Sequence, residues 1–96
     1  MAAKALRLDG RIILITGAGR GLGESYARHI AAIGAHVIVN DLGVGVDGTE
    51  RSSEPANAAV ETIQAAGGKA SADVSDISSP EEANALLDRI LAEHGR

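Results

Sequence analysis

The residues best suited to chemistry form a glycine-rich run from Thr16 to Gly23, which reads T-G-A-G-R-G-L-G. Glycine lets the backbone turn sharply, and its missing Cβ allows a ligand to approach the main chain closely. The first amides of a following helix have no acceptor inside that helix, and the helix dipole is positive there. The run therefore predicts a turn that binds a diphosphate, rather than one that only connects two elements.

The spacing of the glycines narrows the type of turn. The strict G-x-G-x-x-G pattern is absent, because Leu22 stands where its last glycine would fall. A nucleoside-triphosphate loop is excluded as well, since no Gly-Lys-Ser or Gly-Lys-Thr follows. The remaining pattern is T-G-x-x-x-G-x-G, formed by Thr16, Gly17, Gly21 and Gly23.

Hydrophobic periodicity predicts the elements that would position this turn. Strands are expected at 11–16, 36–40 and 69–77, and helices at about 22–33, 55–66 and 79–95. The first strand is expected to be buried on both faces, and a long loop is expected at 42–54. The first helix is expected to bury one apolar face, formed by Leu22, Tyr26, Ile30 and Ile33. The last helix should begin with a capping box made by Ser79 and Glu82.

The alternation of strands and helices predicts an α/β fold with a parallel sheet and no internal domain boundary. Composition excludes several other classes of protein. The net charge is −4 and no basic run occurs, which argues against a nucleic-acid partner. The absence of cysteine and the spacing of the three histidines argue against a metal site. No apolar run is long enough to cross a membrane and no targeting signal is recognised, so a cytoplasmic location is expected.

The T-G-x-x-x-G-x-G turn after a first strand resembles the short-chain dehydrogenase/reductase family. Asp41 at the end of the second strand, 24 residues after Gly17, matches the same family, as do Asp76-Ile77 and Gly95-Arg96. The resemblance implies the N-terminal half of a doubly wound Rossmann fold (βαβαβα), with residues 1–96 as a partial dinucleotide-binding domain. It also implies an NAD(P)-dependent oxidoreductase that passes hydride between nicotinamide and a carbonyl or alcohol. The full-length enzyme is expected to be a homo-oligomer.

The resemblance assigns cofactor-binding roles to nine residues in three groups. The phosphate turn comprises Gly17, Arg20, Gly21, Leu22 and Gly23, the ribose is held by Asp41 with Leu42, and the adenine by Asp76 with Ile77. Asp73-Val74 competes for the adenine role. Asp76 is preferred because it keeps the family spacing to Gly67-Gly68 and to Gly95.

The choice between NAD and NADP depends on two opposing charges. The carboxylate of Asp41 would repel a 2′-phosphate, and like unit charges at roughly 4 Å cost about 4 kcal/mol at an effective dielectric near 20. Arg20 would attract that phosphate, but an exposed contact contributes only about 0–1 kcal/mol. NAD is therefore the expected cofactor.

Catalysis in the family uses a tyrosine and a lysine four residues later. The only tyrosine is Tyr26, and Ile30 stands four residues after it, so no catalytic residue is assigned. Tyr26 is instead expected in the core, and the 96 residues alone are expected to be inactive. The alternative is a non-catalytic nucleotide-binding module. The stretch from Val39 to Gly43 is similar to the 3-hydroxyacyl-CoA dehydrogenase branch that includes the peroxisomal multifunctional enzyme.

Overall fold

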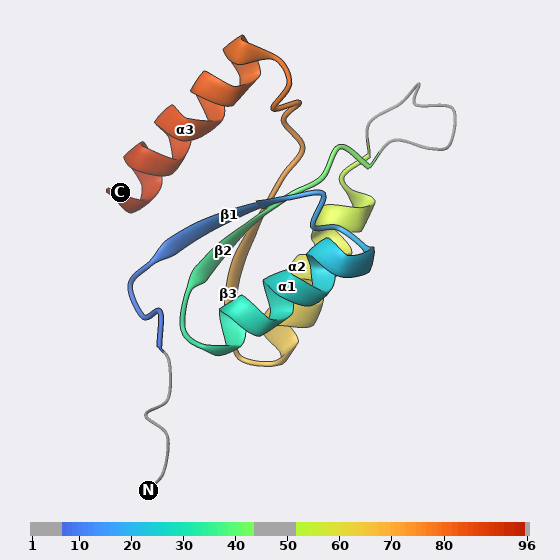
Figure 1. Ribbon diagram of the computed structural model, residues 1–96, viewed down its shortest axis with the longest axis vertical. Coiled ribbons are helices and arrows are strands. Elements are labelled where there is room, and N and C mark those ends of the chain that lie inside the picture. The colour runs from blue at the N-terminus through green and yellow to red at the C-terminus, as the bar shows by residue number, and fades with distance from the viewer. Residues whose placement is uncertain (1–6, 44–51, 96) are drawn as a thin grey trace, which may run out of the picture.

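Three strands and three helices alternate along the chain in the computed structural model, which describes residues 7–43 and 52–95 (Figure 1). The elements are β1 (Ile12–Thr16), α1 (Gly21–Ala32), β2 (His36–Asn40), α2 (Glu54–Ala65), β3 (Lys69–Asp73) and α3 (Pro80–His94). The predicted α/β order is confirmed. All three helices form within one or two residues of their expected bounds.

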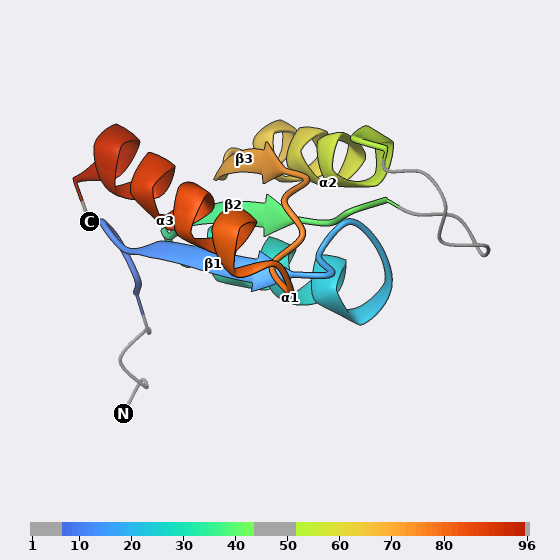
Figure 2. The same cartoon turned by 90° about the horizontal axis from the view of Figure 1, so that it is seen from above.

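The strands form one parallel sheet in the order β1-β2-β3. Thr16, Asn40 and Asp73 are paired in register, so the three strands end together. Figure 2 shows the three arrows pointing the same way, with the turn that leads to α1 beyond the tip of β1. The segments that follow the strands therefore gather at one edge of the sheet, where ligands bind in open α/β folds.

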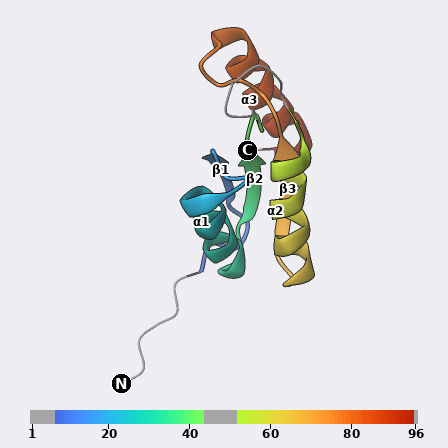
Figure 3. The ribbon, with the colours of Figure 1, turned by 90° about the vertical axis from the view of Figure 1, so that its right-hand side faces the viewer.

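Helices cover both faces of the sheet. Successive side chains of a strand point to opposite faces, so β2 contacts the helices on both sides. Val37 and Val39 of β2 pack with residues of α1 and α2, which run alongside the strands (Figure 3). Ile38 packs instead with Leu86 and Ile90 of α3. In Figure 1, α3 lies on the opposite side of the sheet from α1 and α2.

The prediction that β1 is buried on both faces was wrong for the described residues. Positions 12–15 are only partly buried and Thr16 is exposed. Within residues 7–43 and 52–95, β1 pairs with β2 alone and forms an edge of the sheet. An edge strand has one side without a neighbour, so its aliphatic side chains are only half covered.

The predicted apolar face of α1 was wrong at Leu22 and Tyr26, whereas Ile30 is partly buried and packs against the core. Tyr26 is 55% exposed and Leu22 is 67% exposed, whereas Ala27 and Ala31 are buried. Gly23, Ala27 and Ala31 recur at every fourth position, and these small residues form the face that packs against the sheet and α2. Periodicity of large apolar residues selected a different face of the helix.

The third strand is shorter than predicted, since β3 ends at Asp73 rather than Ile77. The Asp73 carboxylate accepts hydrogen bonds from the Ser75 amide and hydroxyl, each at 2.9 Å. This local bonding turns the chain away from the sheet directly after Asp73. Asp76-Ile77 therefore lies on the loop before α3 and does not end a strand.

The capping box predicted at the start of α3 forms only one of its two hydrogen bonds. The Ser79 hydroxyl accepts a hydrogen bond from the Glu82 amide at 3.3 Å. The Glu82 carboxylate accepts from the Asp76 amide at 2.9 Å, so it holds the preceding loop instead of closing the box on Ser79. At the other end, Gly95 adopts a left-handed φ of 73° and its amide donates to Leu91, as expected for a helix cap.

Candidate functional site

The turn between β1 and α1 presents open backbone at its two left-handed glycines. Gly17 and Gly21 have φ values of +63° and +65°, which side-chain-bearing residues rarely adopt. A Cβ at either position would meet nothing within 4 Å, so the space in front of both is open. The first amides of α1, at Gly21, Leu22 and Gly23, have no acceptor inside the helix. The turn therefore has the geometry expected for a diphosphate.

Two contacts fix the turn against the rest of the fold. The buried Ala18 donates its amide hydrogen to the Asn40 carbonyl at 3.0 Å, which ties the turn to β2. A Cβ on Gly23 would overlap the Gly17 carbonyl oxygen and approach the Ala18 Cα at 3.1 Å. The last glycine of the pattern is thus required by close packing of the helix start against the turn.

Asp41 lies against this turn. Its Oδ2 atom accepts a hydrogen bond from the Gly19 amide at 2.9 Å, and its Oδ1 atom accepts from the Gly43 amide at 2.7 Å. The structure therefore brings together the turn and the carboxylate that sequence reasoning assigned to the ribose.

Gly19 is a site residue that sequence reasoning missed. A Cβ there would lie 2.7 Å from the Pro55 Cβ and 2.8 Å from Asp41 Oδ2. The glycine turn therefore lies in close contact with the start of α2 and with the end of β2. The signal in the sequence is a glycine at a position that the T-G-x-x-x-G-x-G pattern leaves open.

The segment after Asp41 folds back on the start of α2. The Ser52 amide donates to the Leu42 carbonyl at 2.9 Å, and Gly43 adopts a left-handed φ of +65°. We call residues 42, 43, 52 and 55 the neck, because they bring the two ends of the expected long loop together. Residues 44–51 of that loop lie outside the described part of the chain.

A second polar cluster lies on the α3 side of the same edge. Asn40 and Asp73, both nearly buried, are joined by a hydrogen bond of 2.6 Å. Arg89 of α3 forms an ion pair with the same carboxylate. Burial alone would raise the pKa of Asp73, but hydrogen bonds from Asn40, Ser75 and Arg89 outweigh it and hold the pKa below its usual value. This cluster fixes the loop that leads from β3 to α3.

Asp76 and Ile77 lie on that loop. The Asp76 Oδ1 atom accepts hydrogen bonds from the Ser78 amide at 3.0 Å and the Ser78 hydroxyl at 2.6 Å. Ile77 is 42% exposed, which is high for a large apolar side chain. The pair is accessible, but its carboxylate is partly engaged in shaping the loop.

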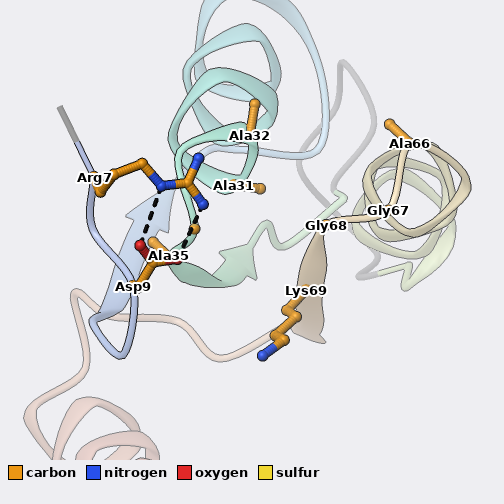
Figure 4. Close-up of a pocket in the computed structure, with 10 residues that line it drawn as sticks. Arg7, Asp9, Ala31, Ala32, Ala35, Ala66, Gly67, Gly68 and Lys69 are labelled. Carbon is orange, nitrogen blue, oxygen red and sulfur yellow. Dashed lines mark hydrogen bonds and ion pairs between the residues drawn. The ribbon is translucent and has the colours of Figure 1, made fainter. Parts of the chain in front are cut away.

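The opposite edge of the sheet carries a cavity of about 230 Å³. Figure 4 shows it between the ends of α1 and α2, with Lys69 at the start of β3 and the ion pair of Arg7 and Asp9 at 3.0 Å. It lies at the amino ends of the strands, so it takes no part in the dinucleotide turn. Across residues 7–43 and 52–95, no three His, Cys, Asp or Glu side chains gather as a metal site would require. The helices of these residues include none long and apolar enough to span a membrane.

Comparison with known proteins identifies the family. A family model described as short chain dehydrogenase matches residues 11–96. The chain belongs to the short-chain dehydrogenase/reductase family. The resemblance drawn from the turn and the Rossmann-type fold class is thereby confirmed, and solved structures similar to this chain hold NADP or NADH.

Individual relatives agree with this assignment. The chain is 46% identical over 94 residues to the peroxisomal multifunctional enzyme type 2 of Mus musculus, covering 98% of this chain and 12% of that protein. A 7α-hydroxysteroid dehydrogenase, solved with NADH and 7-oxo glycochenodeoxycholic acid, superposes with a TM-score of 0.79 at 39% identity. A metagenomic short-chain oxidoreductase in complex with NADP superposes with a TM-score of 0.78 at 34% identity.

The chain spans only part of these proteins. It is covered to 94% and 93% by the two solved structures, but it accounts for 32% and 36% of their chains. The two complexes contain NADH and NADP respectively, so the comparisons leave the family's choice between the two cofactors open for this chain.

Proposed function

We propose that this chain supplies the adenosine- and diphosphate-binding part of an NAD-dependent oxidoreductase. The observation that carries the proposal is the position of the Asp41 carboxylate beside the glycine turn. A carboxylate offers about four acceptor positions. Two are used by the Gly19 and Gly43 amides, and two remain for the two hydroxyl groups of an adenosine ribose.

The remaining cofactor contacts follow from the turn and from the carboxyl edge of the sheet. The amides at the start of α1, from Gly21 to Gly23, hold the diphosphate, and Gly17 allows it to approach the backbone. Arg20 lies beside this turn and is exposed. Leu42 follows Asp41 directly and lines the ribose.

Two aspartates compete for the adenine amino group. Asp73 is 6% exposed and already accepts hydrogen bonds from Asn40, Ser75 and Arg89, which supports Asp76 with Ile77 as the adenine contact. The end of β3 at Asp73 favours the alternative, in which the Val74 amide meets the adenine ring. Titration of the ¹⁵N-labelled chain with AMP separates them, because the larger shift falls on the Ile77 amide in the first case and on Val74 in the second.

The preference for NAD rests on charge. A 2′-phosphate beside Asp41 would meet a like charge at a cost of about 4 kcal/mol, using roughly 4 Å and an effective dielectric near 20. Arg20 offsets only about 0–1 kcal/mol of this, since it is exposed.

In the complete enzyme, the reaction is hydride transfer between nicotinamide and a carbonyl or alcohol, with a 3-hydroxyacyl-CoA as the proposed substrate. Similarity to the mouse peroxisomal multifunctional enzyme supports that substrate class. The printed 96 residues hold no Tyr-x-x-x-Lys pair, so by themselves they bind the cofactor without turning it over. A nucleotide-binding module without catalysis is the second candidate, and an assay of hydride transfer in the complete protein separates the two.

Calorimetric titration of the chain with NAD and with NADP tests the proposal. NAD is expected to bind more tightly, and Asp41→Ala is expected to weaken NAD at least about tenfold, which corresponds to about 1.4 kcal/mol. Asp88→Ala serves as the matched control, because Asp88 is an exposed carboxylate on α3. Equal affinity of both cofactors, or an unchanged affinity for NAD in Asp41→Ala, would refute the proposal.

The compartment and assembly of the complete protein are also proposals. A cytoplasmic location is one proposal, whereas the name of the mouse relative favours the peroxisome. Imaging of a fluorescent fusion against a peroxisomal marker distinguishes the two. The expected homo-oligomer is tested by light scattering of the complete protein.

A further inference from the structure

Asp41 is held by two backbone amides that come from different segments. One is Gly19 in the glycine turn, 22 residues earlier, and the other is Gly43 in the neck, two residues later. Each amide bonds a different oxygen, so rotation of the carboxylate would break at least one hydrogen bond. The side chain is thereby fixed in one orientation beside the turn.

Gly43 can donate from this position only because it is glycine. Its φ of +65° lies in the left-handed region, where a Cβ is disfavoured. A Cβ built there would overlap the Ser52 carbonyl oxygen and approach the Pro55 Cδ at 3.1 Å. Any side chain at position 43 would therefore push the neck apart and displace the amide that Asp41 uses.

We propose that Gly43 is a positioning residue that determines cofactor specificity through Asp41. The inference rests on the proposed function of Asp41 as the ribose carboxylate. A carboxylate free to rotate could swing away from a 2′-phosphate and reduce the repulsion. One held at both oxygens cannot, so NADP meets the whole charge, while the two ribose hydroxyls of NAD find acceptors already oriented.

Pro55 links the glycine turn to the neck. Gly19 contacts both Asp41 and Pro55, and Pro55 in turn borders Gly43. The carboxylate therefore bonds to two glycines that both lie close to Pro55. Disturbing either glycine changes the surroundings of the same two oxygen atoms.

The test compares Gly43→Ala with Gly67→Ala. Both glycines have left-handed φ values, +65° and +89°, but a Cβ on Gly67 meets nothing within 4 Å. Gly67 also lies at the opposite edge of the sheet, beside the cavity in Figure 4. The control thus carries the same kind of backbone strain without disturbing Asp41.

Dissociation constants for NAD and NADP are measured by calorimetry for the unaltered chain and both variants. Gly43→Ala is expected to lower the selectivity for NAD over NADP about tenfold, or about 1.4 kcal/mol, and Gly67→Ala to leave it unchanged. Selectivity retained in a folded Gly43→Ala overturns the inference while the proposed function stands. Failure of the unaltered chain to bind NAD overturns the proposed function itself.

A second measurement needs no variant and applies even where Gly43→Ala fails to fold. Hydrogen exchange of the Gly43 amide is followed by NMR in the unaltered chain with saturating NAD or saturating NADP. Protection of this amide is expected to persist with NAD and with NADP alike, because the carboxylate stays bonded to it in both complexes. Loss of protection with NADP alone would contradict the inference, since the carboxylate would then have rotated away from the phosphate.

Discussion

Asn40 Nδ2 donates a hydrogen bond of 2.6 Å to Asp73 Oδ2, across register-paired positions of β2 and β3. Both side chains are nearly buried, so neither can exchange its partner for water. The same Asn40 amide also donates to the Ser75 carbonyl at 3.0 Å. This pair ties the end of the central strand to the loop that precedes α3.

Replacing Asn40 with alanine is expected to destabilise the fold by about 1–3 kcal/mol, because it leaves a buried carboxylate and a carbonyl short of a donor. Urea unfolding followed by circular dichroism measures the loss. Asn84→Ala is the matched control, since Asn84 is exposed on α3, and it should change stability by no more than about 0.5 kcal/mol. Similar stabilities of the two variants would show that the buried bond contributes little.

Stability is also expected to fall in acid because of Asp73. Burial opposes ionisation, yet the hydrogen bonds from Asn40, Ser75 and Arg89 hold the pKa of Asp73 below its usual value. The unfolded chain then binds a proton at higher pH than the folded chain, so stability is lost below about pH 4, near the reference value for aspartate. Urea unfolding from pH 7 to pH 3 measures this loss. Asp73→Asn should flatten the profile in that range, and an unaltered slope would contradict the assignment.

A second pH effect is expected nearer neutrality, where His36 and His94 meet with ring centroids 4.5 Å apart. Burial lowers the pKa of His36, His94 and Lys69 lower it further, and Glu93 acts in the opposite direction. The His36 Nε2 atom also contacts the Ser71 hydroxyl at 2.8 Å. Because the unfolded chain takes up the proton first, stability should fall as the pH drops below about 6.5.

Chemical denaturation between pH 7.5 and pH 5 checks this effect. His36→Gln should reduce the dependence of unfolding free energy on pH, because it removes the titrating ring. His29→Gln is the control, since His29 is exposed on α1, where its ring contacts the Ser25 carbonyl of the same helix. The expectation fails where both variants keep the profile of the unaltered chain.

Neighbouring leucines of α3 should differ sharply in their effect on stability. Leu86 is 1% exposed and packs with Ile38 and Ile90, whereas Leu87 is 51% exposed. Leu86→Ala is expected to cost about 2–5 kcal/mol through lost burial and a cavity. Leu87→Ala should stay within about 0.5 kcal/mol in the 96-residue chain. Thermal unfolding of both variants measures their losses of stability. Equal losses would mean that α3 does not pack on the sheet through Leu86.

The features predicted correctly are those encoded over a few consecutive residues. The glycines from Gly17 to Gly23 predict the turn because left-handed backbone and close packing leave few other residue types possible. Asp41 was assigned to the ribose by the family resemblance, and it lies beside that turn because parallel strands end at one edge of the sheet. Ser79 marked the start of α3 because its cap depends on a local hydrogen bond.

The features that sequence reasoning missed depend on contacts between distant residues. Asp73 ends β3 early through hydrogen bonds that include one from Asn40, 33 positions away. Gly19 is needed because Pro55 and Asp41 press against it. The buried face of α1 consists of alanines, which contribute little to a hydrophobic pattern. Their small size lets the helix pack closely against the rest of the core.

Asn40 and Asp41 are adjacent in the sequence, yet one faces α3 and the other the glycine turn. A one-residue deletion within β2 would shift every later residue by one position and so move its side chain to the opposite face of the sheet. Asp41 would then take the place of Asn40 next to Asp73, where two negative charges would repel, and Leu42 would take the place of Asp41 beside the glycine turn. Insertions and deletions in this strand are therefore expected to be tolerated far less than point substitutions. A shift of one residue removes both the Asn40–Asp73 hydrogen bond and the carboxylate beside the glycine turn.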